Sequence, residues 1–367
     1  MKLPFLFLFL LLTSLEAQAA KWIVYVGTYT SGDSKGIYAF RFNDSSGTLT
    51  PMGLAAETPN PSFLAVGPDR RFLYAANEET AGGVSAFAID TGELKLLNRV
   101  SSRGSGPCHV ALDKTGKWLF VANYNSGSVA AFPVHIDGSL GEASAFMQHS
   151  GSSVNPQRQE GPHAHSVNVS PDNRFVLVAD LGLDEILTYP IDAAKGLVQA
   201  ESLFKVQPGS GPRHLVFGTD SRFAYAINEM LGTVTAFQYD AAKGKLKELQ
   251  TIPSLPAGFS GANSSAEIAV HPGGKFLYAS NRGDSSIAIF RIDAAKGTLS
   301  GSGHVSTGGN TPRNFAIDPS GKFLLAANQD SGNIVVFRID QKTGAVTPAG
   351  VEAKVAAPVS IVYTQAR

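Results

Sequence analysis

The chain has 367 residues, and its 30 lysines and arginines balance its 30 aspartates and glutamates, so its formal net charge is zero. This balance argues against a nucleic-acid-binding surface, which usually carries an excess of basic residues. The only cysteine, Cys108, excludes a disulfide within the chain, so packing alone has to stabilise the fold.

The first nineteen residues have the layout of a secretory signal peptide. Lys2 precedes an apolar run from Leu3 to Leu12, and the segment ends in Ala17-Gln18-Ala19. Small residues at that place are typical of a cleavage site. We therefore expect cleavage near Ala19, export to the periplasm or the medium, and one mature domain over residues 20–367. The run is short for a membrane span, so stable membrane insertion is not expected, although a retained anchor is the alternative.

A pattern with a period of about fifty residues recurs along the rest of the chain. Each copy has an apolar stretch, a turn such as PDR or PSGK, and a second apolar stretch that closes at an Asn or Asp. The closing residues are Asn77, Asn123, Asp180, Asn228, Asn281 and Asn328. Alternating apolar and β-branched residues, punctuated by Gly, Asn, Asp and Pro, predict strands, and no segment has a convincing helical pattern.

The two ends of the chain supply a seventh copy in two pieces. IVYVGTYT at 23–30 matches the second strand of a repeat, GIYAFRF at 36–42 the third, and APVSIVY at 357–363 the first. Four-stranded repeats of this length are propeller blades, and a blade completed by both chain ends closes the ring. The sequence therefore predicts an all-β fold, a seven-bladed β-propeller of four-stranded antiparallel blades.

The start of the first strand and the end of the second strand of each blade are expected to meet at one mouth of the central channel. Positions that repeat there, such as the closing Asn, are predicted to be structural, and positions that differ are candidates for function. The differing polar positions include Glu78, Cys108, His109, Tyr124, His165, Arg213, His214, Glu229, Glu267, Arg282 and Arg313. Charges beside the axis are costly to bury unless they pair. They form either a functional site or a ring of ion pairs between blades.

Short motifs along the chain carry a family resemblance. They are GTYT at 27–30, GIYAF at 36–40, NPSFLA at 60–65, LYAANE at 73–78, GPCH at 106–109, GPHAH at 161–165, ADLGLD at 179–184, GPRH at 211–214, AINE at 226–229, AEI at 266–268 and SNRG at 280–283. In this order and spacing the set resembles the lactonase family of seven-bladed β-propellers, which includes bacterial 6-phosphogluconolactonases and fungal carboxymuconate-lactonizing enzymes.

The resemblance implies a lactone site at the channel mouth. It implies catalytic candidates at His163 or His165, at Arg213, at Glu229 and at Arg282, with Glu267 as a further candidate. It implies neither a metal nor a cofactor. By their position, we expect His109, His214, Glu267 and Arg313 to contact the substrate.

Lactone opening needs an activated water, a group that holds the negative charge on the carbonyl oxygen, and an acid for the leaving alkoxide. Glu229 or a neutral histidine could act as the base, and a positioned proton-transfer group is worth about 10²–10⁴-fold in rate. Arg213 or Arg282 could bind a carboxylate or phosphate through the planar guanidinium, or stabilise the oxyanion. The residue types do not distribute these roles uniquely.

The histidines of GPHAH allow three interpretations. Residues two apart in a strand point to the same face, so His163 and His165 could project together. A zinc site would need further ligands, for which His109 and His214 are available but not required by any spacing. Proton transfer or substrate contact is the interpretation we favour, with metal ligation and simple packing as alternatives.

Three functions remain open at this point. Hydrolysis of a sugar-type lactone leads, and export favours an unphosphorylated or other extracytoplasmic lactone over a cytoplasmic sugar phosphate. A muconate-type lactonizing cycloisomerase and a non-catalytic exported binding scaffold are the alternatives. The scaffold predicts closed ion pairs among Arg213, Glu229 and Arg282 with no accessible cavity, whereas an open polar pocket favours catalysis.

Other features of the sequence carry weaker expectations. Cys108 is expected to be a small buried residue, because nothing in its surroundings predicts a stabilised thiolate. The segments 150–160 and 253–263 lengthen two connections and are either lids or surface insertions. A closed propeller needs no second subunit, so the expected state is a monomer whose partner is a small-molecule lactone.

Overall fold

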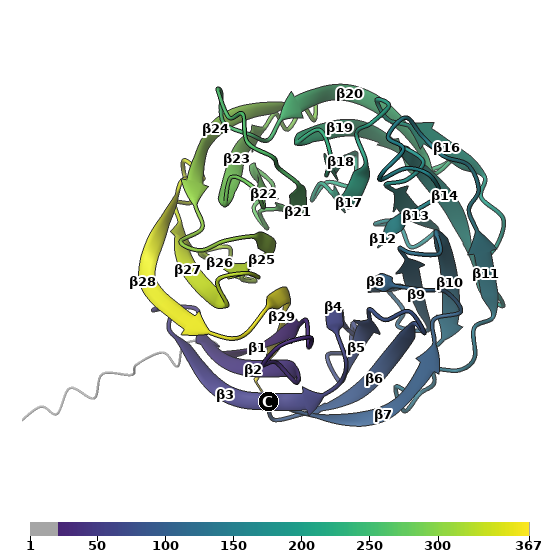
Figure 1. Ribbon diagram of the computed structural model, residues 1–367, viewed down its shortest axis with the longest axis horizontal. Helices are drawn as coiled ribbons and strands as arrows, with labels where there is room; N and C mark the ends of the chain where they lie inside the picture. The colour runs from purple at the N-terminus through teal and green to yellow at the C-terminus, as the bar shows by residue number, and fades with distance from the viewer. Residues whose placement is uncertain (1–20, 367) are drawn as a thin grey trace, which may run out of the picture.

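The structure, a computed structural model, describes residues 21–366, so the predicted signal peptide lies outside the described residues. Twenty-nine strands form seven antiparallel sheets that surround a central channel like the blades of a propeller (Figure 1). The predicted seven-bladed, all-β fold is confirmed. Residues 21–366 contain no helix long and apolar enough to cross a membrane.

One blade combines both ends of the chain. Its strands, from the channel outward, are β29 (Pro358–Gln365), β1 (Lys21–Thr28), β2 (Gly36–Asn43) and β3 (Leu49–Glu57). In Figure 1 the yellow C-terminal strand accordingly lies on the channel side of the purple N-terminal strands. The predicted closure of the ring is confirmed, with strand bounds shifted by one or two residues. Because the ends pair with each other, the N-terminal strand β1 is not left as a sheet edge.

Each of the other six blades is continuous in sequence, with its first strand innermost. In chain order the strands are β4 (Pro61–Val66), β5 (Phe72–Asn77), β6 (Gly83–Asp90), β7 (Glu93–Ser101); β8 (Pro107–Leu112), β9 (Trp118–Asn123), β10 (Ser128–Pro133), β11 (Ala145–Gln148); β12 (Ala164–Val169), β13 (Phe175–Asp180), β14 (Glu185–Asp192), β15 (Gly196–Leu197), β16 (Ser202–Lys205); β17 (Pro212–Phe217), β18 (Phe223–Asn228), β19 (Thr233–Asp240), β20 (Lys245–Pro253); β21 (Ser265–Val270), β22 (Phe276–Asn281), β23 (Ser286–Ile292), β24 (Leu299–Ser306); and β25 (Pro312–Ile317), β26 (Phe323–Asn328), β27 (Asn333–Ile339), β28 (Val346–Lys354). In one of these blades β15 and β16 share the outer position, both paired with β14.

Blades pack on one another through a repeated contact between a turn glycine and an aromatic ring. Gly138, in the turn between β10 and β11, lies against Phe72 of the preceding blade, and a Cβ at Gly138 would come within 2.2 Å of that ring. The same contact recurs at Gly47 on Phe323, Gly196 on Trp118, Gly244 on Phe175, Gly297 on Phe223 and Gly344 on Phe276. These glycines also adopt positive φ values, which other residues adopt only with strain. The sequence AAKG, which occurs at 193–196, 241–244 and 294–297 and ends in three of these glycines, therefore forms hairpin turns with a packing role.

The closing Asn of most blades holds the connection that leads into its own blade. Asn77, Asn123, Asn281 and Asn328 are fully buried, and each donates from its amide to a backbone carbonyl of that connection. This confirms their predicted structural role. Asp180 differs, because it accepts a hydrogen bond of 2.6 Å from Nδ1 of the buried His149.

Every innermost strand carries a β-bulge near its start. On β12, for example, Ala164 pairs with Asp180 and Ser166 with Ala179, so His165 is left without a partner in the ladder. The residues at the same place in the seven blades are Ser62, Cys108, His165, Arg213, Ala266 with Glu267, Arg313 and Val359. A bulge redirects a side chain locally. These bulges place the residues that differ between blades at the channel.

Candidate active site

A cavity of about 190 Å³ lies at the mouth of the channel where the bulges meet. Its lining is polar and comes from several blades: Glu78, Cys108, Tyr124, Arg158, His165, Glu229, Arg282 and Arg313. Seven of these eight residues, all except Arg158, occupy positions that the sequence predicts to lie at the mouth. The ion pairs of Arg213 and Arg282 with Glu229, which the scaffold interpretation predicts, are present, and an open polar cavity, which favours catalysis, lies beside them.

Glu229, which follows β18, is the anionic centre of the site. Its Oε2 lies 3.1 Å from Nε of Arg213 and 2.9 Å from Nη2 of Arg282, and its Oε1 lies 2.7 Å from Nη2 of Arg158. Burial alone would raise the pKa of this carboxyl, but the three guanidinium groups lower it to about 2. Glu229 is thus a permanent carboxylate and a weak base.

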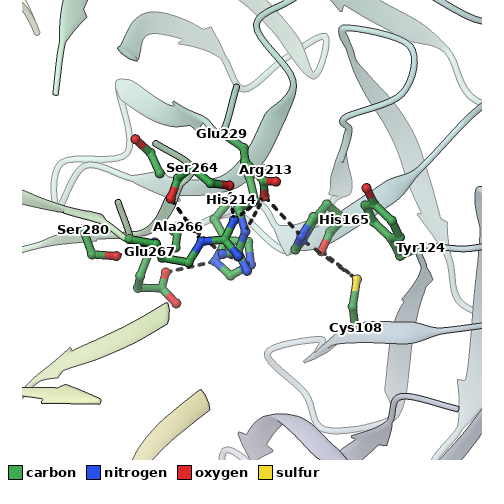
Figure 2. Close-up of polar contacts among 12 residues, drawn as sticks. Cys108, Tyr124, His165, Arg213, His214, Glu229, Ser264, Ala266, Glu267 and Ser280 are labelled. Carbon is green, nitrogen blue, oxygen red and sulfur yellow. Dashed lines mark hydrogen bonds and ion pairs between the residues drawn. The ribbon is translucent and has the colours of Figure 1, made fainter. Parts of the chain in front are cut away.

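His165 is the better-placed proton acceptor. Its Nε2 lies 3.9 Å from Oε2 of Glu229, and its ring meets the edge of the Tyr124 ring (Figure 2). Burial, together with the charge of Arg213, holds the imidazole pKa well below its usual value. The ring is therefore neutral at pH 7 and can accept a proton.

Cys108 lies beside His165 but has the features of a structural thiol. Its Sγ lies 3.3 Å from the backbone oxygen of His165 and 3.8 Å from Nδ1 of that ring. Burial raises the pKa of the thiol, so the reactive thiolate is disfavoured. The expectation of a small buried residue agrees with its 6% exposure.

Arg313 offers a cationic group to the cavity from the β25 bulge. Its guanidinium lies over the Tyr29 ring, 5.3 Å from the centroid, and the Tyr29 hydroxyl donates to Oε2 of Glu78 at 2.9 Å. Across residues 21–366 the Arg313 guanidinium makes no ion pair and no hydrogen bond. It is thus available to a substrate oxygen.

A second polar layer lies deeper in the channel and supports the first. Nδ1 of His214 lies 3.0 Å from Oε1 of Glu267, and Nη1 of Arg213 lies 3.2 Å from Nε2 of His214 (Figure 2). Since Arg213 can only donate, His214 is neutral and carries its proton on Nδ1. His109 stacks on Phe63 with ring centroids 3.9 Å apart. His109, Arg213, His214 and Glu267 do not line the mouth cavity, and their contact with a substrate stays a prediction. Within the protein, Glu267 binds His214, which in turn binds Arg213.

The two histidines of GPHAH do not project together. His163 precedes β12, its ring stacks on Tyr124 with centroids 4.5 Å apart, and its Nδ1 lies 2.9 Å from the Tyr124 backbone oxygen. Only His165 lines the cavity. The expectation that residues two apart in a strand share a face does not apply here, because His163 lies before β12 and His165 lies in the bulge.

Arg158 is the site residue that the sequence analysis missed. It belongs to the segment 150–160, which was interpreted only as a lid or an insertion. A charged residue in a long connection on the mouth side was the available signal. Tyr124 and Glu78, each directly after a closing Asn, lie at the mouth as their positions predict, but they are not among the candidate catalytic or substrate-binding residues.

Within residues 21–366, His, Cys, Asp and Glu side chains form no group of three that could hold a metal ion. The carboxylate that could contribute a ligand, Glu229, is already surrounded by guanidinium groups. The charged or titratable side chains that line the mouth include arginine, histidine and carboxylate groups.

Comparison with known proteins identifies the family. The family described as "Lactonase, 7-bladed beta-propeller" matches residues 23–363. The protein belongs to this family. The chain is 37% identical over 290 residues to a 6-phosphogluconolactonase of Bacillus subtilis, covering 78% of this chain and 82% of the relative. It is 41% identical over 297 residues to a 6-phosphogluconolactonase of Formosa agariphila, covering 77% and 83%.

The solved structure of a gluconolactonase aligns with nearly the whole chain. The periplasmic gluconolactonase of Pseudomonas aeruginosa superposes with a TM-score of 0.91 at 36% identity, covering 95% of this chain and all of that one. This similarity extends over all seven blades of the lactonase-family protein described here, and so over every blade that contributes to the mouth.

Proposed function

We propose that the protein hydrolyses a sugar-type lactone in the mouth cavity. The observation that carries this proposal is the cavity itself, in which a neutral imidazole faces several guanidinium groups. The names of the relatives, 6-phosphogluconolactonase and periplasmic gluconolactonase, support the same reaction class.

The proposed reaction uses His165 as the proton carrier. Its Nε2 accepts a proton from water as the water oxygen attacks the lactone carbonyl carbon. The carbonyl oxygen becomes an oxyanion that Arg313 or Arg282 stabilises. When the bond between the carbonyl carbon and the ring oxygen breaks, the imidazolium returns the proton to that oxygen. Glu229, 3.9 Å from the imidazole, stabilises its cationic form.

The charge of the site supports an anionic lactone, such as one with a 6-phosphate. Three guanidinium groups, those of Arg158, Arg282 and Arg313, line the cavity with the two carboxylates Glu78 and Glu229, so the lining carries an excess of positive charge. A phosphate monoester carries about two negative charges at pH 7. The same excess suits the carboxylates of a muconate-type substrate, which keeps the cycloisomerase as the second candidate.

Export of the mature protein belongs to the same proposal. The Pseudomonas relative is named as periplasmic, and the N-terminal segment of this chain has the composition of a signal peptide. In that setting the physiological substrate would be an unphosphorylated aldonolactone, whereas the positive charge of the cavity favours an anionic lactone. Rates measured on δ-gluconolactone and on its 6-phosphate distinguish the two.

The test follows the opening of δ-gluconolactone and its 6-phosphate by the mature protein, with spontaneous opening subtracted, and compares the His165→Gln and Arg213→Ala variants. We expect enzymatic hydrolysis that falls about 10²–10⁴-fold in His165→Gln, because the proton carrier is lost. A folded wild-type protein that opens neither lactone above background would reject the proposal. Cyclisation of a carboxymuconate by that protein would then favour the cycloisomerase.

A further inference from the structure

Arg158 reaches the mouth from a connection that is itself held firmly. The backbone N–H groups of Gln157 and Arg158 donate to Oδ1 of Asn155 at 3.0 and 3.2 Å, and that of Gln159 donates to the Asn155 backbone oxygen at 2.7 Å. The Gln159 side chain is fully buried and donates to the Leu181 backbone oxygen at 2.9 Å. The turn is therefore fixed on the rim, and only the long Arg158 side chain extends over the cavity.

Arg158 differs from the two other arginines that bind Glu229. Arg213 also donates to the Ala266 backbone oxygen at 2.7 Å, and Arg282 to the Ser264 backbone oxygen at 3.0 Å, so both are fixed by backbone acceptors. Among residues 21–366, the Arg158 guanidinium has only the Tyr124 hydroxyl, at 3.2 Å, as a further partner. Its side chain is 42% exposed, compared with 3% for Arg213 and 15% for Arg282.

Glu229 would remain paired if Arg158 left it. Arg213 and Arg282 both lie on Oε2, whereas Arg158 alone lies on Oε1. Removing the last cation from a buried carboxylate is strongly destabilising, but removing one of three leaves the charge compensated. Among the three arginines, Arg158 can thus leave Glu229 and bind a ligand at the smallest cost in free energy.

We infer that Arg158 is a specificity-determining residue, which binds the anionic group that a lactone substrate carries outside its ring. In the free protein Glu229 holds the guanidinium over the cavity, and an incoming phosphate or carboxylate takes the place of Glu229 as its partner. The planar guanidinium can donate two parallel hydrogen bonds to such a group. The inference rests on the proposed function and adds the residue that discriminates charged from uncharged lactones.

The experiment compares wild type, Arg158→Ala and Arg158→Lys, with Gln157→Ala as the matched control from the same turn. Two quantities are measured: kcat/KM for 6-phosphogluconolactone and δ-gluconolactone, and calorimetric binding of the ring-opened products 6-phosphogluconate and gluconate. We expect Arg158→Ala to lower the ratio of the two kcat/KM values about 10- to 100-fold, the usual effect of one hydrogen-bonded charge. Arg158→Lys should recover part of the ratio, and Gln157→Ala should leave it unchanged.

The two measurements separate the inference from the proposed function. Equal losses on both lactones in Arg158→Ala would overturn the inference, because Arg158 would then act only by orienting Glu229. A wild-type protein that opens both lactones without preference would overturn it while leaving the proposed function standing. Selective loss of 6-phosphogluconate binding in Arg158→Ala, in a protein that opens no lactone, would keep the anion site and reject the hydrolase. Absence of both binding and hydrolysis in wild type would reject both.

Discussion

The channel contains two buried glutamates at two depths, and their environments have opposite effects. Glu229 at the mouth is 4% exposed and Glu267 in the deeper layer is 8% exposed, so burial is nearly equal. Three guanidinium groups lower the pKa of Glu229 to about 2. Burial raises the pKa of Glu267, although the carboxylate accepts hydrogen bonds from His214, Asn314 and the Ile268 backbone N–H.

The difference shows that three guanidinium groups in direct ion pairs reverse the effect of burial on the pKa of a carboxyl group, whereas hydrogen-bond donors and the charge of Arg213 without an ion pair offset it only in part. The two residues accordingly have different roles. Glu229 keeps a fixed negative charge among the arginines at the mouth. Glu267 orients His214, which in turn accepts a hydrogen bond from Arg213, and so acts as a positioning residue.

Glu229→Gln tests the mouth carboxylate and has the largest expected effect. The amide cannot compensate three guanidinium groups, so we expect the free energy of unfolding at pH 7 to fall by about 3 kcal/mol, as when one partner of a buried ion pair is removed. Urea denaturation followed by fluorescence measures this. A loss well below 1 kcal/mol would mean that water, and not Glu229, compensates the arginines.

The pH dependence of the same variant gives an independent check. Because the folded-state pKa of about 2 lies below the ordinary value of 4.5, ionised Glu229 stabilises the fold above pH 4.5, and this contribution disappears as the pH falls towards 2. The shift corresponds to about 3 kcal/mol. The difference in unfolding free energy between wild type and Glu229→Gln should therefore shrink on acidification. A constant difference would contradict the assigned charge.

Glu267→Gln has a smaller expected effect, with the opposite dependence on pH. The amide keeps an acceptor oxygen for His214 but presents its NH₂ group to the amide of Asn314, so we expect a loss of about 1 kcal/mol at pH 7. Because the folded-state pKa of Glu267 is raised, its contribution to stability is present below the ordinary glutamate pKa and is lost as the pH rises.

Acidification should therefore raise the unfolding free energy of wild type relative to that of Glu267→Gln. Relative to Glu229→Gln, acidification should lower the unfolding free energy of wild type. Urea denaturation of both variants over the same pH series makes the comparison internal. If both glutamate variants respond to acid in the same direction, the distinction between the two layers is wrong.

The propeller could be predicted because the same physical contacts recur in every blade. The turn glycine that packs on a ring, the Asn that holds a connection and the strand alternation all leave a regular trace in the sequence. The mouth positions could be predicted for the same reason, since each inner strand presents the same register position, such as Arg213 and Arg313, to the channel.

The depth and direction of individual side chains could not be predicted from the period of the strands. His165 lies in a one-residue bulge, where side chains do not alternate as they do in a regular strand. His163, two residues away, therefore does not share its direction and stacks on Tyr124. Arg158 could not be assigned to the site because its position depends on how an irregular connection folds against Leu181. Both cases concern local geometry that breaks the repeat.

Changes at Cys108 have the smallest expected effect, and they test whether its thiol is unreactive in the folded protein. Because burial raises the pKa of its thiol and its Sγ lies 3.3 Å from the His165 backbone oxygen, the folded protein should react with iodoacetamide at pH 8 far more slowly than the same protein in urea. Mass spectrometry of the labelled chain measures both rates on the single cysteine. Cys108→Ala removes a weak S–H donor and a small volume, so the expected loss of stability is below about 1 kcal/mol. Rapid alkylation of the folded protein would instead show that the thiolate forms beside His165, and the cysteine would then have to be counted among the reactive groups of the cavity.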